Sequence, residues 1–252
     1  MIARQDVNDD RPIMLLTGAS RGIGHATVKH FQKNGWRILT VSRQPFSEDC
    51  GWPEARENHI QADLAEIDRI DDLAREVRSR LSHGKLHALV NNAGISPKGP
   101  DGARLGLLDT DAAVWTQVLH VNLVSTALLA RALLPELERT GGSIVNVTSI
   151  AGSRVHPFAG VAYAASKAAL ASLTREMAHE FGRRGVRANA IAPGEIETSI
   201  LSPGTDELIA AEVPMGRLGD ASEVASTIYF LCTDASSYIN GAEVHINGGQ
   251  HV

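Results

Sequence analysis

Cysteine and net positive charge are both scarce in this sequence, and each shortage argues against a class of protein. The 252 residues include two cysteines, Cys50 and Cys232, which form neither a CxxC pair nor a metal-ligand spacing. We therefore expect reduced thiols without a role, and no metal site. The formal net charge is −5, which gives no reason to expect a nucleic-acid partner.

Long apolar runs and a secretory signal are also missing. No apolar stretch reaches the roughly 18 residues that a helix needs to span a bilayer. The first twelve residues, MIARQDVNDDRP, are polar and lack the apolar centre of a signal peptide. We expect residues 1–12 to be a flexible leader, residues 13–252 to form a single domain, and the protein to be cytoplasmic with no membrane partner.

Strand-like and helix-like segments alternate over the rest of the chain. Short apolar runs predict strands at 13–17, 36–41, 60–62, 88–90, 143–147, 187–191 and 243–246. Helices are expected from a glycine-rich turn to about 34, and over about 67–82, 111–136, 159–183 and 221–232. The alternation predicts an α/β fold, a doubly wound parallel sheet of about seven strands with helices on both faces. In such sheets ligands bind beyond the carboxyl ends of the strands.

The glycine-rich turn, TGASRGIG at 17–24, joins the first strand to the first helix. Glycines permit a tight turn and let backbone N–H groups approach a pyrophosphate, which the helix N-terminus also favours. The spacing is GxxxGxG rather than GxGxxG, and a purely structural glycine turn is the alternative. The candidate cofactor-binding residues in this turn are Gly18, Ser20, Arg21, Gly22, Ile23 and Gly24.

The end of the second strand bears on the choice of cofactor. An acidic residue there would bind the ribose 2′-hydroxyl of NAD(H), but this sequence has Ser42 and Arg43. A guanidinium can pair with a 2′-phosphate through two hydrogen bonds, and Arg21 would add a second positive contact. We therefore expect NADP(H) to be favoured over NAD(H), with a solvated surface arginine as the alternative for Arg43.

Polar residues and glycine also follow the third and fourth strands. Asp63, next to Leu64, suits the adenine amino group, and Asn92 and Gly94 suit the ribose side of the cofactor. Each could equally be a strand-end cap or a turn residue.

A tyrosine and a lysine stand four residues apart on the helix predicted over 159–183. This spacing puts Tyr163 and Lys167 on one face, one turn apart. A phenol is a poor proton donor and acceptor at neutral pH, but a neighbouring ammonium and an oxidised nicotinamide favour the phenolate and lower its pKa. The pair therefore predicts a general acid/base, with a core-edge tyrosine and a lysine reaching to solvent as the alternative.

Two more polar residues complete the candidate catalytic group. Ser149 follows the fifth strand, where its hydroxyl can share developing oxyanion charge with Tyr163. Asn122 lies inside an apolar helix, where it needs partners. It would anchor a water in a proton relay toward Lys167, or it is a satisfied core residue. A serine-hydrolase interpretation of Ser149 is poor because GxSxG is absent, and HExxH is absent too.

Together these residues resemble the short-chain dehydrogenase/reductase family over about residues 13–249. The motifs follow the order of that family: TGASRGIG at 17–24, Asp63-Leu64, NNAG at 91–94, Asn122, Ser149, YAASK at 163–167, Asn189 with Pro193-Gly194, and NGG at 247–249. The resemblance implies a Rossmann-like single domain with Asn122, Ser149, Tyr163 and Lys167 as a catalytic tetrad. Tyr163 would protonate a carbonyl oxygen as hydride reaches its carbon.

The resemblance also implies further contacts and an assembly. Lys167 would hold the nicotinamide ribose, Pro193, Gly194 and Ile196 would bracket the nicotinamide, and Thr198 would bind its carboxamide or the pyrophosphate. Family members are commonly homotetramers built partly from the two long helices, here near 111–136 and 159–183. The substrate would be a ketone or aldehyde, or a secondary alcohol in the reverse direction. A cofactor-sensing protein without activity is the alternative.

The sequence is most similar in pattern to 3-oxoacyl-[acyl-carrier-protein] reductases, but it departs from them near the substrate. The stretch 95–110 is longer, the loop between Ser149 and Tyr163 has one extra residue, and Glu195 replaces an apolar or aromatic residue. An acid there would disfavour an anionic substrate and suit a hydroxylated or cationic one. An acyl thioester and a polyol or sugar-type substrate both stay open. Arg139 and Arg184 fall near positions that contact the acyl carrier protein in the family, or are surface charges.

Overall fold

The computed structural model describes residues 9–45, 54–197, 209 and 211–252. Its centre is a seven-stranded sheet in the order β3-β2-β1-β4-β5-β6-β7, and all neighbouring strands are parallel. The strands are β1 Ile13–Thr17, β2 Arg37–Ser42, β3 His59–Gln61, β4 Ala88–Asn91, β5 Ser143–Val147, β6 Arg187–Pro193 and β7 Glu243–Ile246. The predicted α/β fold, with its doubly wound parallel sheet in a single domain, is confirmed.

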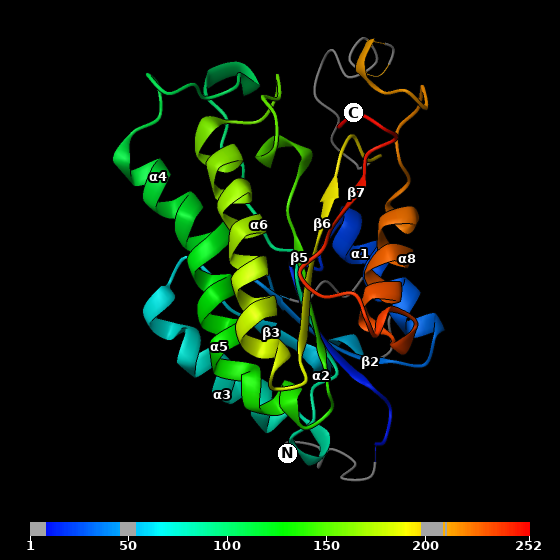
Figure 1. Ribbon diagram of the computed structural model, residues 1–252. Helices are drawn as coiled ribbons and strands as arrows, with labels where there is room; N and C mark the ends of the chain where they lie inside the picture. Colours follow the sequence, from blue (N-terminus) through cyan, green and yellow to red (C-terminus); the bar gives the residue numbers. More distant parts are fainter. Residues whose placement is uncertain (1–8, 46–53, 198–208, 210) are drawn as a thin grey trace.

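Helices cover both faces of this sheet (Figure 1). On one face lie α3 (Ile70–Ser79), α4 (Ala112–Leu119), α5 (Ser125–Glu138) and α6 (Val161–Gly182). On the other face α1 (Gly22–Lys33) packs against α8 (Ala221–Cys232). Short helical turns connect these elements: α2 Ala55–Asn58, η1 Ile67–Arg69, η2 Ser82–Gly84, η3 Pro100–Gly102, η5 Ile150–Gly152 and η6 Asp234–Ser236.

Each face of the sheet has its own hydrophobic core because successive strand residues point to opposite sides. In β1, Ile13 and Leu15 pack in the core under α3, α5 and α6, whereas Met14 and Leu16 pack in the core under α1 and α8. This explains why the strands read as continuous apolar runs: a parallel sheet covered on both faces leaves no side for polar residues.

A π-helical turn, His120–Val124, interrupts the long helix that the sequence predicts over 111–136. It separates α4 from α5 and contains Asn122, so the segment is three pieces rather than one regular helix. Single π turns inside α-helices are frequent at functional sites, because the extra residue per turn changes where a side chain points.

The same stretch, Ala112–Glu138, is long and apolar enough to cross a membrane by length and composition alone, so the expectation that no apolar stretch reaches this length is wrong. Half of its most apolar window is buried inside the protein, where Leu129, Leu133 and Leu137 pack against the sheet. A core helix meets the same criterion, so the finding is weak evidence for a membrane span.

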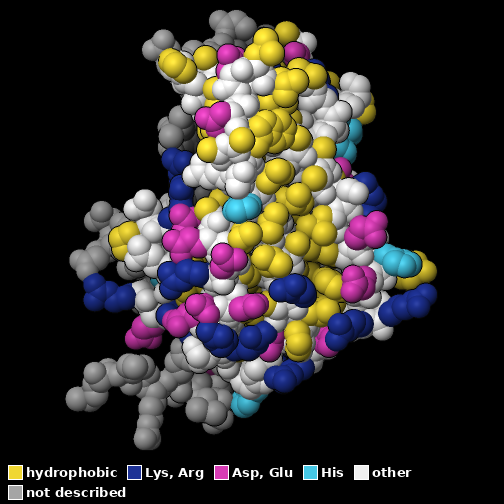
Figure 2. Space-filling model, turned by 90° about the vertical axis from the view of Figure 1, so that its left-hand side faces the viewer, with side chains coloured by type: hydrophobic (Ala, Val, Ile, Leu, Met, Phe, Trp, Pro, Cys, Tyr) yellow, Lys and Arg dark blue, Asp and Glu magenta, His cyan; other side chains and the backbone are white. Residues whose placement is uncertain are grey.

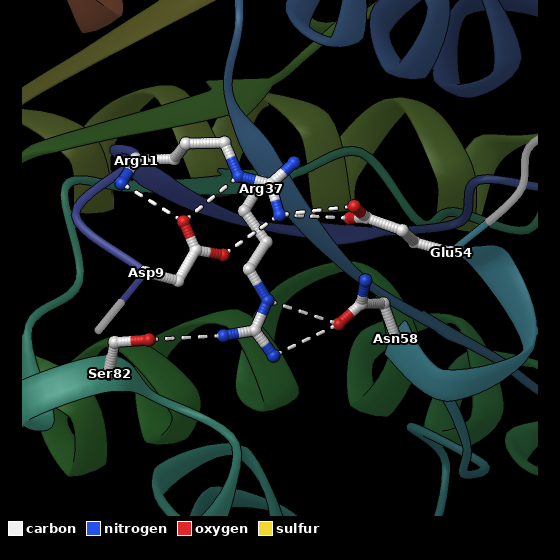
Figure 3. Close-up of polar contacts among 6 residues, drawn as sticks. All are labelled: Asp9, Arg11, Arg37, Glu54, Asn58 and Ser82. Carbon is white, nitrogen blue, oxygen red and sulfur yellow. Dashed lines mark hydrogen bonds and ion pairs between the residues drawn. The ribbon is translucent and has the colours of Figure 1, made fainter. Parts of the chain in front are cut away.

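The amino end of the sheet is held by a polar network around Arg37 (Figure 3). The buried Arg37 guanidinium donates to Asn58 Oδ1 and Ser82 Oγ at 3.1–3.3 Å, and Arg11 pairs with Asp9 and Glu54. Residues 9–12 therefore contact the domain. The flexible leader stays a prediction, and residues 1–8 of it lie outside the described residues.

Candidate active site

The predicted catalytic residues come together at the carboxyl edge of the sheet. Ser149 follows β5, Tyr163 and Lys167 lie in the first turns of α6, and Asn122 lies in the π-helical turn. Three different elements thus bring four polar side chains, spread over 46 positions of sequence, to one end of the fold.

Lys167, like Asn122, is almost fully buried. Its ammonium donates to Val147 O at 2.7 Å and lies 5.6 Å from the centre of the Tyr163 ring. Burial lowers the pKa of Lys167 to about 8. A lysine that is held by a backbone carbonyl and desolvated in this way can exchange a proton near neutral pH.

The environment of Tyr163 differs from the sequence expectation. Burial raises the pKa of the phenol, a hydrogen bond with Ser149 lowers it, and the charge of Glu195 raises it. The pKa is therefore raised, not lowered, because desolvation outweighs the neighbouring polar groups. The backbone amide of Ala151 donates to Ser149 Oγ at 3.2 Å. This leaves the Ser149 hydroxyl proton to be donated toward Tyr163 or a substrate oxygen.

Asn122 has partners on both sides of its amide. Its Oδ1 accepts from Ile95 N at 2.8 Å, and its Nδ2 donates to Ile95 O and Ser166 Oγ at 3.0 Å. Ser166 Oγ in turn donates to Tyr163 O at 2.7 Å. Asn122 therefore ties the segment after β4 to the helix that carries Tyr163, and the water relay stays a prediction.

A cleft of about 420 Å³ opens beside this group, at the ends of β1, β2 and β4. Predicted cofactor residues in its lining are Gly18, Ser20, Arg21, Ser42, Arg43, Asp63, Leu64, Asn92 and Gly94. Of the other turn residues, Gly22 opens α1, and Ile23 packs against the core under α1 and α8.

Close backbone packing shapes the phosphate end of this cleft. A Cβ on Gly24 would come within 2.1 Å of Gly18 O, so no larger residue fits there. Gly18 itself has a φ of 73°, a left-handed conformation that glycine adopts readily. Asn92 Nδ2 fastens the turn by donating to Thr17 O and Gly18 O at 3.1 and 2.7 Å.

The far end of the cleft carries the residues predicted to bind the adenosine. Arg43 is exposed, and its backbone oxygen accepts from Gln61 Nε2 at 3.0 Å. Asp63 Oδ1 accepts from Ala65 N at 2.9 Å, which is the strand-end cap weighed as its alternative role. A cap of this kind uses one carboxylate oxygen and leaves the other available.

The near end of the cleft meets the catalytic residues. A Cβ on Gly94 would lie 3.3 Å from Lys167 Nζ and 3.6 Å from Asn122 Oδ1, so the cleft and the tetrad share a wall. Pro193 ends β6 and Gly194 follows it. Ile196 packs into the core under α1 and α8, and Thr198 lies outside the described residues.

One pair of residues was missed by sequence reasoning. Nε2 of His156 lies 2.5 Å from Oε1 of Glu195, and both side chains are mostly buried. The sequence draws attention to Glu195 and to the unusual length of the loop after Ser149. It carries no signal that His156, 39 positions earlier, is the partner.

Two observations concern other candidate sites. A larger cavity, about 750 Å³, lies at the amino ends of the strands beside Trp36, His87 and Tyr238, away from the predicted site residues. Among the described residues, no three His, Cys, Asp or Glu side chains come together as metal ligands would.

Comparisons with known proteins identify the family of this chain. The family described as "Enoyl-(Acyl carrier protein) reductase" matches residues 18–251. Protein FixR of Bradyrhizobium diazoefficiens is 56% identical over 251 residues, 99% of this chain and 90% of FixR. The 3-oxoacyl-[acyl-carrier-protein] reductase FabG of Escherichia coli is 31% identical over 256 residues, 98% of this chain and all of FabG.

A solved structure is similar over most of the chain. It is an oxidoreductase of the short-chain dehydrogenase/reductase family from Brucella ovis, in complex with a partially ordered NAD. It is 57% identical, covers 94% of this chain and 100% of its own, and superposes with a TM-score of 0.83. The chain belongs to the short-chain dehydrogenase/reductase family of oxidoreductases, which bind a nicotinamide cofactor.

Proposed function

We propose that this protein transfers hydride between NADP(H) and a ketone or aldehyde, or a secondary alcohol in the reverse direction. The observation that carries the proposal is the meeting of Tyr163, Lys167 and Ser149 at the end of a cleft with a glycine-lined floor. The cleft suits a dinucleotide because the tight approach of Gly18 and Gly24 leaves backbone, not side chains, to meet a pyrophosphate.

Proton transfer would be the task of Tyr163. The cofactor, when bound, supplies or accepts the hydride. In reduction the Tyr163 phenol donates its proton to the carbonyl oxygen, and in oxidation it takes the hydroxyl proton. The Ser149 hydroxyl donates to the same oxygen and stabilises its developing charge. The Lys167 ammonium, buried one turn further along α6, can return the proton because its pKa is about 8.

The preference for NADP(H) is supported by the residues at the end of β2. Ser42 and Arg43 line the cleft where an acidic residue would select NAD(H), and Arg21 adds a second positive charge. The Brucella ovis relative was solved with NAD. A titration of the wild-type protein with NADPH and NADH therefore tests this part of the proposal, and tighter binding of NADH would overturn it.

A homotetramer is supported by the outer face of the long helices. Figure 2 shows a band of hydrophobic side chains along the side of the molecule that α4, α5 and α6 cover. Half-buried apolar residues of α4 to α5 include Val114, Trp115, Leu119, Val124 and Ala127. Such a band is larger than single scattered apolar residues, and burying it against a second copy would stabilise an assembly. Light scattering after size-exclusion chromatography measures the number of chains.

For an acyl carrier protein as partner, the two candidate contact residues are Arg139 and Arg184. Arg139 donates to Gly84 O at 3.2 Å and Arg184 pairs with Glu138, so both already have partners. Arg184 also lies beyond the end of α6, about 30 Å along the helix from Tyr163 at 1.5 Å per residue. A cytoplasmic location stays a prediction.

A panel of carbonyls and alcohols tests the reaction itself. Each compound is mixed with the protein and NADPH or NADP⁺, and turnover is followed at the absorbance of NADPH. Consumption of at least one carbonyl or secondary alcohol is expected. Binding of cofactor without turnover of any compound would contradict the enzymatic function and favour a cofactor-sensing protein.

A further inference from the structure

The pair formed by His156 and Glu195 stands beside the catalytic tyrosine, although the reaction as proposed does not require it. Glu195 follows Gly194 directly after β6, and His156 lies in the loop between Ser149 and Tyr163. The exposed fractions of the two side chains are 9% for His156 and 16% for Glu195. Removing a carboxylate from water costs free energy, so its retention next to Tyr163 calls for a function.

The hydrogen bonds assign a net charge to this pair. Phe158 N donates to His156 Nδ1 at 3.3 Å, so Nδ1 is an acceptor and the ring proton sits on Nε2. Nε2 then donates to Glu195 Oε1 at 2.5 Å. A neutral imidazole and a carboxylate leave one negative charge on the pair.

The loop that carries His156 is fixed from outside by the extended stretch after β4. Within it, Lys98 and Arg104 pair as a short antiparallel bridge. Lys98 Nζ donates to Phe158 O, and Arg104 Nε donates to Ala159 O at 2.8 Å. Val161 N donates to Leu105 O at 3.0 Å. The longer stretch thereby sets the position of His156 and, through it, of Glu195.

Glu195 lies at the same edge of the sheet as Ser149, because Glu195 follows β6, Ser149 follows β5, and these two strands are paired. The charge of Glu195 contributes to the raised pKa of Tyr163. Its backbone is also fixed, because Gly219 N donates to Glu195 O at 2.9 Å. Among the described residues, the side chain of Glu195 accepts one hydrogen bond, on Oε1, which leaves Oε2 without a protein donor.

We propose that Glu195, held by His156, selects the substrate by accepting a hydrogen bond from a hydroxyl or ammonium group on a carbon next to the reacting one. The inference rests on the proposed function and names its substrate class. A carboxylate accepts several hydrogen bonds and donates none, so Oε2 suits a donor. The same charge disfavours substrates with a carboxylate or phosphate near the reacting carbon.

Four matched alcohols test the selection: cyclohexanol, its vicinal diol, 2-aminocyclohexanol and 2-hydroxycyclohexanecarboxylate. Turnover with NADP⁺ is compared for the wild type, Glu195→Gln, and the exposed control Glu197→Gln. In the wild type, kcat/KM for the diol or the amino alcohol should exceed that for cyclohexanol about 10- to 100-fold, as expected for a hydrogen bond to a charged group. The hydroxy acid should be the poorest substrate.

Glu195→Gln should remove this preference mainly through KM, so that kcat/KM for the diol and the amino alcohol falls relative to kcat/KM for cyclohexanol. The amide presents N–H groups, so the amino alcohol should lose more than the diol, whose hydroxyl can accept, and the hydroxy acid should improve. The larger of the two wild-type kcat/KM values tells whether Glu195 prefers an ammonium or a hydroxyl donor. Equal turnover of cyclohexanol, diol and amino alcohol by the wild type, or equal losses in the variant, would overturn the proposal.

The role of His156 is one of positioning, and its variants separate position from charge. His156→Phe should abolish the preference, and His156→Gln, which restores an N–H donor, should recover part of it. Unchanged selectivity in His156→Phe would remove His156 from the proposal.

Binding of the four alcohols can also be measured without turnover, by calorimetry on the NADP⁺-loaded Tyr163→Phe variant. The measurement is repeated on the double variant that also carries Glu195→Gln. Stronger binding of the diol or amino alcohol that depends on Glu195 supports selection even if nothing is oxidised, in which case only the proposed reaction fails. Equal binding of all four would overturn the selection.

Discussion

The cofactor cleft is formed largely by backbone and short turns, whereas the region beside Tyr163 is formed by side chains from segments far apart in the sequence. At the cleft, Gly18, Gly24 and Asn92 pack within a few ångströms of one another along β1 and β4. Beside Tyr163, His156 meets Glu195, and Lys98 meets Phe158 across 60 positions. Backbone geometry tolerates little substitution, while contacts between side chains can change one residue at a time.

This difference suggests that cofactor binding and substrate selection depend on different parts of the molecule. The four proposed catalytic residues lie on the boundary, because a Cβ on Gly94 of the cleft would lie 3.3 Å from Lys167 Nζ and 3.6 Å from Asn122 Oδ1. The same wall can therefore hold a cofactor in many proteins, while the other side of Tyr163 adapts to one substrate.

The largest effect should come at the boundary itself, from Tyr163→Phe. Loss of the phenol proton should lower kcat by about 10²- to 10⁴-fold, the usual contribution of a general acid/base. Binding of NADPH should be unchanged, since the ring stays. Steady-state kinetics measure kcat, and fluorescence titration measures the affinity for NADPH. Tyr238→Phe, which changes a fully exposed tyrosine, is the control. Retained turnover would show that Tyr163 is not the acid/base.

Gly24→Ala should weaken cofactor binding without altering the residues beside Tyr163. The added Cβ would lie 2.1 Å from Gly18 O, so the turn must shift and the backbone groups that meet the pyrophosphate move with it. Overpacking of this kind costs about 1–3 kcal/mol, which corresponds to roughly 10- to 100-fold weaker NADPH binding. Gly106→Ala, where the nearest atom is 3.5 Å from the new Cβ, is the matched control. Wild-type affinity in Gly24→Ala would contradict the assigned role of the turn.

The cofactor side could be predicted from sequence because its signals are local. A glycine-rich turn, an apolar strand and a capped helix can each be recognised from their own residues. Gly18 and Gly24 mark the turn, and α8 was predicted at its observed bounds. The strands were found to within two residues at either end because buried parallel strands read as uninterrupted apolar runs.

The substrate side could not be predicted in the same way. The π-helical turn depends on Asn122 reaching Ile95, and the pairing of His156 with Glu195 depends on where two loops end. The sequence also predicted a lowered pKa for Tyr163 from the nearby lysine and an oxidised nicotinamide, because it showed neither the burial of the phenol nor that the charge of Glu195 acts on it. Contacts of this kind become visible only when the fold brings the segments together.

Arg43→Asp should change the preference of the protein between NADPH and NADH. Loss of a guanidinium that pairs with the 2′-phosphate should weaken NADPH binding about 10- to 100-fold, whereas NADH, which has no such phosphate, should bind as well or better. Fluorescence titration measures both affinities. Arg183→Asp makes the same charge change on an exposed residue at the opposite edge of the sheet and should leave both values unchanged. An equal effect of Arg43→Asp on the two cofactors would leave Arg43 as a surface arginine.

The smallest predicted effect links the two sides through proton transfer. The negative charge of Glu195 disfavours the Tyr163 phenolate, so Glu195→Gln should lower the pKa of Tyr163. Alcohol oxidation needs the phenolate, so activity falls as Tyr163 becomes protonated, and the acidic limb of its pH profile should therefore move to lower pH. Cyclohexanol is the suitable substrate because it offers no donor to Glu195.

Burial of Tyr163 and its bond to Ser149 are unchanged by this variant, and so is Lys167, which makes the shift a measure of one charge. Glu197→Gln removes an equal charge from an exposed position and should leave the profile in place. A shift to higher pH in Glu195→Gln, or the same shift in both variants, would mean that the carboxylate held by His156 does not act on the tyrosine.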